Sequence, residues 1–422
     1  MANERGRNVR DVRRSNRSLL LRQLYFQPQA SRLELSRATG LSAASVSSVI
    51  AELIDAGVVV ESGAVESEGG RPRIQLRVAA SRFQVVGVDV GETRVRVERF
   101  DLALTELARA EIPMTPGRYE PAGVVAAIAA GLAAVGVPET APGTQLLGIG
   151  IGVPGIVVGP PESVVHCQTI GWDAVPLEAL LREVTDLPLF IDNGANTLGQ
   201  AEMWFGAGRG ASDTLFLLIG SGIGASVTVD GVAYRGSSTS AGEWGHITAA
   251  IGGRRCRCGA RGCLEAYIGA ESVIARYAEA TGGAPDLADA ADEESALLRI
   301  LAAASQGTTS AGPDPDPESD RAAAARAVLD ETALHLGVSI GNLVNLFNPE
   351  RIIIGGWAGL LMAPELLPRV HEVAREHALR YPFGKAAIEL GRLGPDAVAR
   401  GAATLPVARF LSTAGAPSRG AG

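Results

Sequence analysis

The spacing of apolar residues over the first eighty positions predicts three helices followed by two strands. A helix with one apolar side is expected at 17–26, and a capping box at Ser31 and Glu34 begins a short helix that ends at Gly40. Ser42 precedes a third helix, in which apolar residues recur every three or four positions: Val46, Val49, Ile50, Leu53 and Ile54. Alternating residues at 58–61 and 73–78 predict a hairpin. This order of elements, with a tight glycine turn before the third helix, is typical of a winged helix-turn-helix.

Beyond residue 85 the pattern changes to apolar strands that run into glycines, as in VVGVDVG, LLGIGIG, LFLLIGSG and IIIGG. Alanine-rich helices are expected between them at 121–136, 270–281 and 321–347. This alternation predicts α/β lobes with glycine loops at the strand ends. None of the apolar runs is long enough to span a bilayer, and the arginine-rich N-terminus lacks the apolar segment of a secretory signal. We therefore expect a cytoplasmic protein with no membrane partner.

The charge of the chain is unevenly distributed. The net charge is −8, but residues 1–82 carry thirteen Arg and no Lys against eight acidic residues, a local net of +5 that leaves −13 for the remainder. A basic head on an acidic body favours double-stranded DNA as the partner of the head. A solvated basic face and a protein-binding helical domain are the alternatives. The residues expected to meet DNA lie on the exposed start of the third helix and in the hairpin loop: Ala43, Ala44, Ser45, Ser47, Ser48 and Arg71.

Three of the four cysteines lie within eight residues of one another, shortly after a histidine. Structural zinc sites are tetrahedral and use four Cys or His ligands, so this cluster predicts a structural Zn²⁺ held by His246, Cys256, Cys258 and Cys263. A group of buried thiols is the alternative, whereas a disulfide between Cys256 and Cys258 would be strained. Clustered rather than paired cysteines also favour a reducing compartment. Because Glu243 and Glu265 bracket the ligands, the metal would brace a polar pocket.

Three glycine loops follow predicted strands and could bring backbone amides close to phosphates. They are Asp89-Val-Gly91-Glu-Thr93, Gly220-Ser-Gly222-Ile-Gly224 and Gly355-Gly356. In this order they resemble the actin-like ATPase fold of sugar kinases. Together with GEWGH and CxCGxxGCLE, they make residues 15–410 similar to the ROK family of repressors and kinases, and the winged head resembles that of its repressor branch. The resemblance implies an α/β fold with a winged helix-turn-helix at 1–82, a small lobe at 83–190 closed by 396–412, and a large lobe with the zinc motif at 191–395.

The resemblance also implies roles for individual residues. The four clustered Cys and His residues match the zinc ligands of the family. Its sugar-hydroxyl contacts are matched by Asn193, Glu243, His246 and Glu265, with His246 using one ring nitrogen for the metal and the other for the sugar. The effector is thus expected to be a sugar or sugar phosphate. The nucleotide loops are expected to be vestigial at Asp89, Gly91, Thr93, Gly222, Gly224, Gly355 and Gly356.

Two departures from the family pattern bear on catalysis. Family kinases carry Asn-Asp-Ala-Asn, whereas this chain reads Asn193-Gly-Ala-Asn196, and the spacing to Glu202 puts Gly194 at the position of the catalytic base. Asp192 lies two residues away, about 6–7 Å along a strand, while a base must come within about 3 Å of its proton. Glu92 stands where the kinases usually have Gly, and its carboxylate would repel a triphosphate.

These observations predict a sugar-responsive transcriptional regulator of carbohydrate genes, more specifically a repressor, with no catalytic residue. We expect a homodimer or homotetramer on an inverted repeat. A bifunctional ATP-dependent sugar kinase that uses Asp192 as its base is the alternative.

Overall fold

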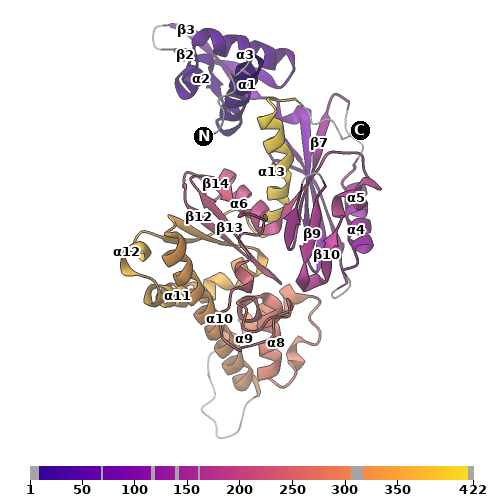
Figure 1. Cartoon of the computed structure of the whole chain (residues 1–422), viewed down its shortest axis with the longest axis vertical. Helices are drawn as coiled ribbons and strands as arrows, with labels where there is room; N and C mark the ends of the chain where they lie inside the picture. Colours follow the sequence, from indigo (N-terminus) through magenta and orange to yellow (C-terminus); the bar gives the residue numbers. More distant parts are fainter. Residues whose placement is uncertain are drawn as a thin grey trace.

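The computed structural model describes residues 9–67, 70–115, 119–137, 142–159, 162–305 and 317–416. Figure 1 shows a helical head above two α/β lobes, with helix α13 (Ala397–Ser412) running from the head into the space between the lobes. The expected fold class, a winged helix-turn-helix followed by a two-lobed α/β body, is confirmed. Among the described residues, no helix combines the length and the apolar character needed to cross a bilayer.

The head consists of three helices and a three-stranded sheet of order β1-β3-β2. Its elements are α1 (Val9–Phe26), β1 (Ala30–Ser31), α2 (Arg32–Thr39), α3 (Ala43–Asp55), β2 (Val59–Ser67) and β3 (Gly70–Val78). The capping box is confirmed, since Glu34 N donates to Ser31 Oγ at 3.3 Å and Ser31 N donates to Glu34 Oε2 at 2.7 Å. Gly40 ends α2 with φ of 69°. The first helix begins at Val9, eight residues before the predicted start, because its first two turns are polar and give no apolar periodicity.

The small lobe is built on a five-stranded sheet of order β11-β7-β4-β5-β6. Its strands β4, β7 and β11 are parallel, and β5 and β6 are antiparallel. Their bounds, with those of the remaining elements of this lobe, are β4 (Phe83–Val90), β5 (Arg94–Asp101), β6 (Glu106–Pro113), α4 (Pro121–Ala134), β7 (Gln145–Val153), β8 (Ile156–Val158), β9 (Val164–Cys167), β10 (Trp172–Val175), α5 (Leu177–Arg182) and β11 (Leu189–Asn193). The sheet therefore extends past the boundary expected at residue 190, as far as Asn193.

Two helices cover opposite faces of this sheet. Alternate residues of β4, such as Val86 and Val88, pack with α4. On the other face, Gly87 and its neighbour Gly150 on β7 contact α13. A methyl group at Gly87 would lie 1.9 Å from the carbonyl oxygen of Ala399, so only glycine lets the helix approach so closely.

The large lobe follows helix α6 (Gly194–Phe205) and has a sheet of order β14-β13-β12-β15-β16. Its strands are β12 (Thr214–Ile219), β13 (Ile223–Val229), β14 (Val232–Tyr234), β15 (Arg351–Gly355) and β16 (Ala387–Leu390). Its helices are α7 (Glu265–Ile268), α8 (Ala270–Ala280), α9 (Glu293–Ser305), α10 (Pro317–Phe347), α11 (Trp357–His377) and α12 (Arg380–Phe383). The predicted helices at 121–136, 270–281 and 321–347 correspond to α4, α8 and α10.

The head and the small lobe share one hydrophobic core. Leu20, Leu21 and Leu24 of α1 belong to the same buried cluster as Phe83 of β4 and Phe410 of α13. The rings of Phe83 and Phe410 lie 4.9 Å apart, and Ser18 Oγ donates to the carbonyl oxygen of Leu411 at 2.8 Å. The head is therefore packed onto the small lobe rather than joined to it by a free linker.

Candidate functional site

A cavity of about 440 Å³ lies between the two lobes. Most of the residues expected to bind a sugar or a nucleotide line it: Asp89, Gly91, Thr93, Asn193, Gly222, Gly224, Glu243, His246, Glu265 and Gly356. Gly355 does not, because it ends β15 with its α-carbon facing Leu198 of α6. The volume is within the range of small-molecule sites. Loops that are far apart in the sequence thus meet in one pocket.

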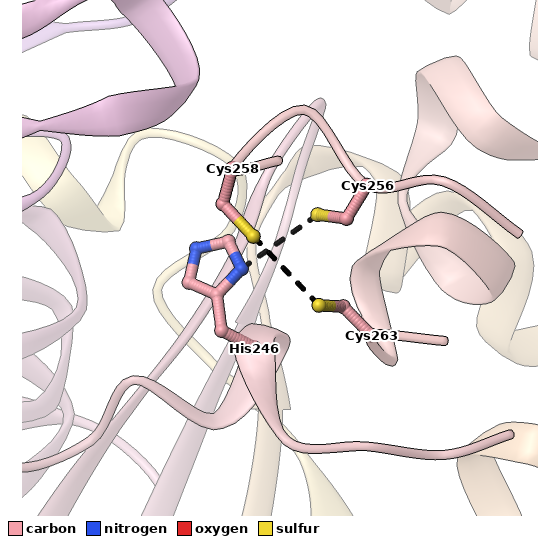
Figure 2. A group of neighbouring side chains, drawn as sticks. All are labelled: His246, Cys256, Cys258 and Cys263. Carbon is pink, nitrogen blue, oxygen red and sulfur yellow. Dashed lines mark hydrogen bonds between the residues drawn. The ribbon is translucent and has the colours of Figure 1, made fainter. Parts of the chain in front are cut away.

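The four expected metal ligands lie together beside this cavity. Their ligand atoms are all within 4.8 Å of one another. Cys256 Sγ is 3.8 Å from His246 Nδ1, and Cys258 Sγ is 3.7 Å from Cys263 Sγ (Figure 2). A tetrahedral ion with metal–sulfur bonds of about 2.3 Å would space its sulfurs about 3.8 Å apart. The residues present therefore fit a tetrahedral metal ion with three thiolates and one imidazole.

The backbone of the ligand loop is folded into tight turns that bring the ligands together. Cys256 N donates to Ala260 O at 2.8 Å, and Gly262 N donates to Arg254 O at 2.7 Å. Gly262 has φ of 80°, and a methyl group there would lie 1.7 Å from Ala250 O, which explains the glycine directly before Cys263. Burial raises the pKa of the Cys256 and Cys263 thiols, so a cation is needed to stabilise their thiolate forms.

His246 lies at the boundary between the metal cluster and the cavity. Its Nδ1 faces Cys256, and its other ring nitrogen points away from the sulfurs in Figure 2. The same side chain lines the cavity. One imidazole can therefore bind a metal through Nδ1 and a ligand hydroxyl through Nε2.

The three other sugar-contact candidates differ in how much hydrogen-bonding capacity they retain. Glu265 is 4% exposed, and its Oε2 accepts from Ile223 N at 3.1 Å. Asn193 caps α6, accepting from Ala195 N at 2.7 Å and donating to Gly155 O at 2.7 Å. The carboxylate of Glu243 accepts no hydrogen bond in the described part of the chain, and burial raises its pKa against the opposing effect of His246. Glu243 is thus the carboxylate with most capacity for a ligand.

Glu92 forms a bidentate ion pair with Arg257, a residue that sequence reasoning missed. Arg257 Nη2 donates to Glu92 Oε1 at 3.1 Å, and Nη1 donates to Glu92 Oε2. Arg257 also lies 3.0 Å from Glu271 Oε2 and 3.5 Å from Glu265 Oε1. Because Arg257 stands between two metal ligands in the sequence, its closeness to the site could have been predicted, but its partner 165 positions away could not.

This ion pair joins the lobes at the glycine loops. Glu92 follows β4 of the small lobe, and a methyl group at Gly222 of the large lobe would lie 3.3 Å from Glu92 Oε1. Arg94 and Glu294 make a second ion pair between the lobes, at 3.3 Å. Glu92 was expected to repel a triphosphate, and here its carboxylate lies against the second glycine loop, bound to an arginine.

Asp192 does not face the cavity in the way a catalytic base would. Its Oδ1 accepts from Asn193 N at 2.8 Å, Asn196 Nδ2 at 3.1 Å and Arg235 Nη1 at 2.6 Å. Among the described residues, the cavity wall includes Asn193, Gly194 and Ala195 but not Asp192. A methyl group at Gly194 would meet its nearest neighbours at 3.7 Å, so the position has room for a side chain.

Asp89 lies in a network of charges at the far end of the cavity. Desolvation raises its pKa to about 6, against the opposing effect of Arg96 and Arg94. Arg96 in turn pairs with Glu111 at 2.7 Å and with Asp396, the residue before α13. The two arginines therefore offset part of the cost of burying this carboxylate.

The expected DNA-contacting residues lie on the surface of the head, away from the cavity. Ala43, Ala44, Ser47 and Ser48 are exposed, and Ser45 is half-buried with its Oγ 2.9 Å from Ser42 Oγ. The opposite side of α3 is buried in the head through Val46, Val49, Ile50 and Leu53. The helix therefore presents small side chains outward, which allows a close approach to a groove. The side chain of Arg71 lies outside the described part of the structure.

Comparison with known proteins adds to this geometry. The model of the ROK family matches residues 85–408. The xylose repressor of Caldicellulosiruptor bescii is 30% identical over 407 residues, which cover 95% of this chain and 97% of the repressor. A glucokinase of Halalkalibacterium halodurans is 34% identical over 74% of this chain and 91% of the kinase. The crystal structure of a ROK family transcriptional regulator, a homolog of the E. coli MLC protein, has a TM-score of 0.72 and 23% identity and covers 96% of this chain and 98% of that one.

The metal cluster leads to a first prediction. The protein purified without chelators is expected to hold about one tightly bound ion per chain, with zinc favoured by the donor set. Cys258→Ser is expected to lose this ion and to lower the melting temperature, because three ligands hold the ion less tightly than four. Metal analysis by mass spectrometry and a thermal melt measure both effects. Cys167→Ser is the matched control, since Cys167 is free and outside the cluster. Metal-free wild-type protein would contradict the prediction.

Proposed function

The chain belongs to the ROK family, and on that basis we propose that it is a sugar-responsive transcriptional regulator that binds a DNA operator with its head and a sugar in the cavity between its lobes. The observation that carries this proposal is the presence of both parts in one chain. The similarity to the xylose repressor extends over 95% of this chain, whereas that to the glucokinase extends over 74%. Repression of carbohydrate genes is the regulatory role that these relatives favour.

The head is proposed to bind the major groove through the exposed start of α3. Small side chains at Ala43, Ala44, Ser47 and Ser48 let the helix backbone approach the bases, and serine hydroxyls can donate to or accept from base edges. Arg71, in the hairpin of β2 and β3, is proposed to enter the minor groove. A homodimer would place two such heads on an inverted repeat.

The cavity is proposed to bind a sugar through Glu243, His246 and Glu265, with Asn193 at its edge. Carboxylates and an imidazole around a pocket suit the neighbouring hydroxyls of a pentose or hexose. The carboxylates can accept from hydroxyls, and the Nε2–H of a His246 whose Nδ1 binds a metal can donate to a hydroxyl oxygen. A structural zinc ion is proposed at the Cys and His cluster. Its contribution is to fix the orientation of His246 and the position of Glu265, two residues beyond the last thiolate.

We propose that this regulator does not transfer phosphate. Gly194 offers no side chain as base, and Asp192, which does not line the cavity, accepts from three donors. The bifunctional kinase is retained as the second candidate, because Gly222, Gly224 and Gly356 all line the cavity as nucleotide loops would.

The DNA-binding part of the proposal predicts a specific salt dependence. Arg71→Ala is expected to weaken binding to the chain's own promoter region and to lower the slope of log affinity against log salt by about one, because one phosphate-neutralising charge is lost. Fluorescence anisotropy at several salt concentrations measures the slope. Arg392→Ala, which removes an equal charge from an exposed residue of the large lobe, is expected to change neither quantity. Equal slopes for the two variants would exclude the hairpin from the interface.

The sugar-binding part predicts that Glu243→Ala abolishes the thermal shift caused by an effector but leaves the metal bound. Loss of a hydrogen bond to a charged group costs about 1.5–3 kcal/mol, which is about ten- to a hundredfold in affinity. A thermal-shift screen that begins with D-xylose and D-glucose, with metal analysis of the same samples, measures both. Glu372→Ala, at an exposed carboxylate on α11, is the control. An effector that shifts Glu243→Ala as much as wild type would lie in another site.

The catalytic part predicts no detectable phosphorylation of any sugar by the wild-type protein. A general base supplies about a hundred- to ten-thousandfold in rate. In addition, the ion pair of Glu92 and Arg257 lies against the second glycine loop. The double variant Glu92→Gly with Gly194→Asp should be the better rescue than Gly194→Asp alone, because it also frees Arg257 to meet phosphate. A coupled ATP-consumption assay measures all three. Ordinary kinase rates in wild type, lost in Asp192→Asn, would establish the bifunctional kinase instead.

A further inference from the structure

Four aromatic side chains join the end of α1 in the head to the end of α6 between the lobes. They are Tyr25, Phe26, Trp204 and Phe205, called here the ring cluster. The ring of Trp204 meets Phe26 edge-on at 5.1 Å and Tyr25 at 6.0 Å between centroids. Phe205 lies 6.3 Å from Tyr25 and 6.4 Å from Phe26. Three of these pairs are edge-to-face and the pair of Phe26 and Phe205 is tilted, and such contacts are attractive at these distances, so the two helix ends are in contact.

The other end of α6 is part of the cavity wall. Asn193, Gly194 and Ala195 all line the cavity. The first turn is held by Asn193, whose Oδ1 accepts from Ala195 N at 2.7 Å and Asn196 N at 3.4 Å and whose Nδ2 donates to Gly155 O. A sugar hydroxyl that bonds to Asn193 therefore competes with the hydrogen bonds that fix the start of α6.

The middle of α6 is packed closely on α13. The helix has 12 residues, a length of about 18 Å at 1.5 Å per residue. It packs closely on α13, where a methyl group at Gly401 would lie 1.9 Å from Thr197 O, and Gln200 Nε2 donates to Thr404 Oγ1 at 2.6 Å. One continuous helix, packed on α13, therefore links the cavity wall to the ring cluster.

The ring cluster is less firmly packed than the core that joins the head to the small lobe. Leu20, Leu21 and Leu24 of that core are fully buried, whereas Phe205 is 36% exposed. The hydroxyl of Tyr25 is buried without a hydrogen-bond partner among the described residues, and burial raises the pKa of this tyrosine. An unpaired buried hydroxyl favours a rearrangement that would hydrate it. Tyr25 and Trp204 pack against the edge of that core, so the ring cluster is the more exposed part of the attachment of the head.

We propose that the ring cluster is the contact through which occupancy of the cavity changes the orientation of the head, with α6 as the connecting element. The inference rests on the proposed function, because it presupposes a ligand in the cavity and DNA on the head. A ligand that favours one position of the first turn of α6 favours one arrangement of the four rings. By linkage, operator DNA changes sugar affinity by the same factor as sugar changes operator affinity.

The test compares this coupling factor in wild type and in two variants. Trp204→Leu removes the ring that meets both Tyr25 and Phe26 while keeping an apolar side chain, and Phe205→Ala removes a partly exposed ring that the fold tolerates losing. Operator affinity is measured by anisotropy with and without D-xylose or D-glucose, and sugar affinity by calorimetry without DNA. Wild type is expected to show a coupling factor of about tenfold or more. Both variants should lower it to within about twofold of unity, with sugar affinity in the absence of DNA nearly unchanged.

Phe347→Ala is the matched control, since Phe347 is a partly exposed ring at the end of α10 and makes no ring contact with the head among the described residues. It should keep the wild-type coupling factor. A folded Trp204→Leu or Phe205→Ala protein with the full wild-type factor would overturn the inference and leave the proposed function standing. A wild-type factor of one with every sugar that binds would instead overturn the proposed function, and this inference with it.

Discussion

The position of the polar groups in the cavity depends on the cluster of metal ligands, whose four ligand atoms lie within 4.8 Å of one another. His246 extends from this cluster into the cavity, Arg257 stands between two of the ligands, and Glu265 follows the last of them by two residues. A tetrahedral ion restricts these three side chains at once, because each ligand fixes the backbone next to it. The Glu243 carboxylate and the glycine loops form a binding site only together with these three side chains.

Parts of the molecule could be predicted from sequence because their signals are local. Ser31 and Ser42 cap the starts of helices and Gly40 ends one, each through a backbone group three or four residues away. The metal ligands lie within a span of eighteen positions. Helices α6 and α13 gave no such signal. Both are rich in small residues and buried on several sides, so an apolar stripe does not develop along them.

The interactions that the sequence could not predict are those between distant segments. Glu92, which was expected to repel a triphosphate, forms an ion pair between the lobes with Arg257. Asp192, the base of the alternative kinase prediction, accepts from Arg235, a residue 43 positions away. In both cases the sequence identified a carboxylate near the site but could not identify the arginine that pairs with it, because pairing depends on the tertiary fold.

The shared core of head and small lobe bears on how such proteins can be recombined. A head cut away at residue 82 would leave Phe83, Phe100, Leu102 and Phe410 without the leucines of α1 that cover them. A chimera that exchanges only the first 82 residues between relatives would set foreign side chains on the end of α13. Exchange of DNA specificity therefore requires either transplanting α13 together with the head, or changing only the surface of α3 and leaving its buried side untouched.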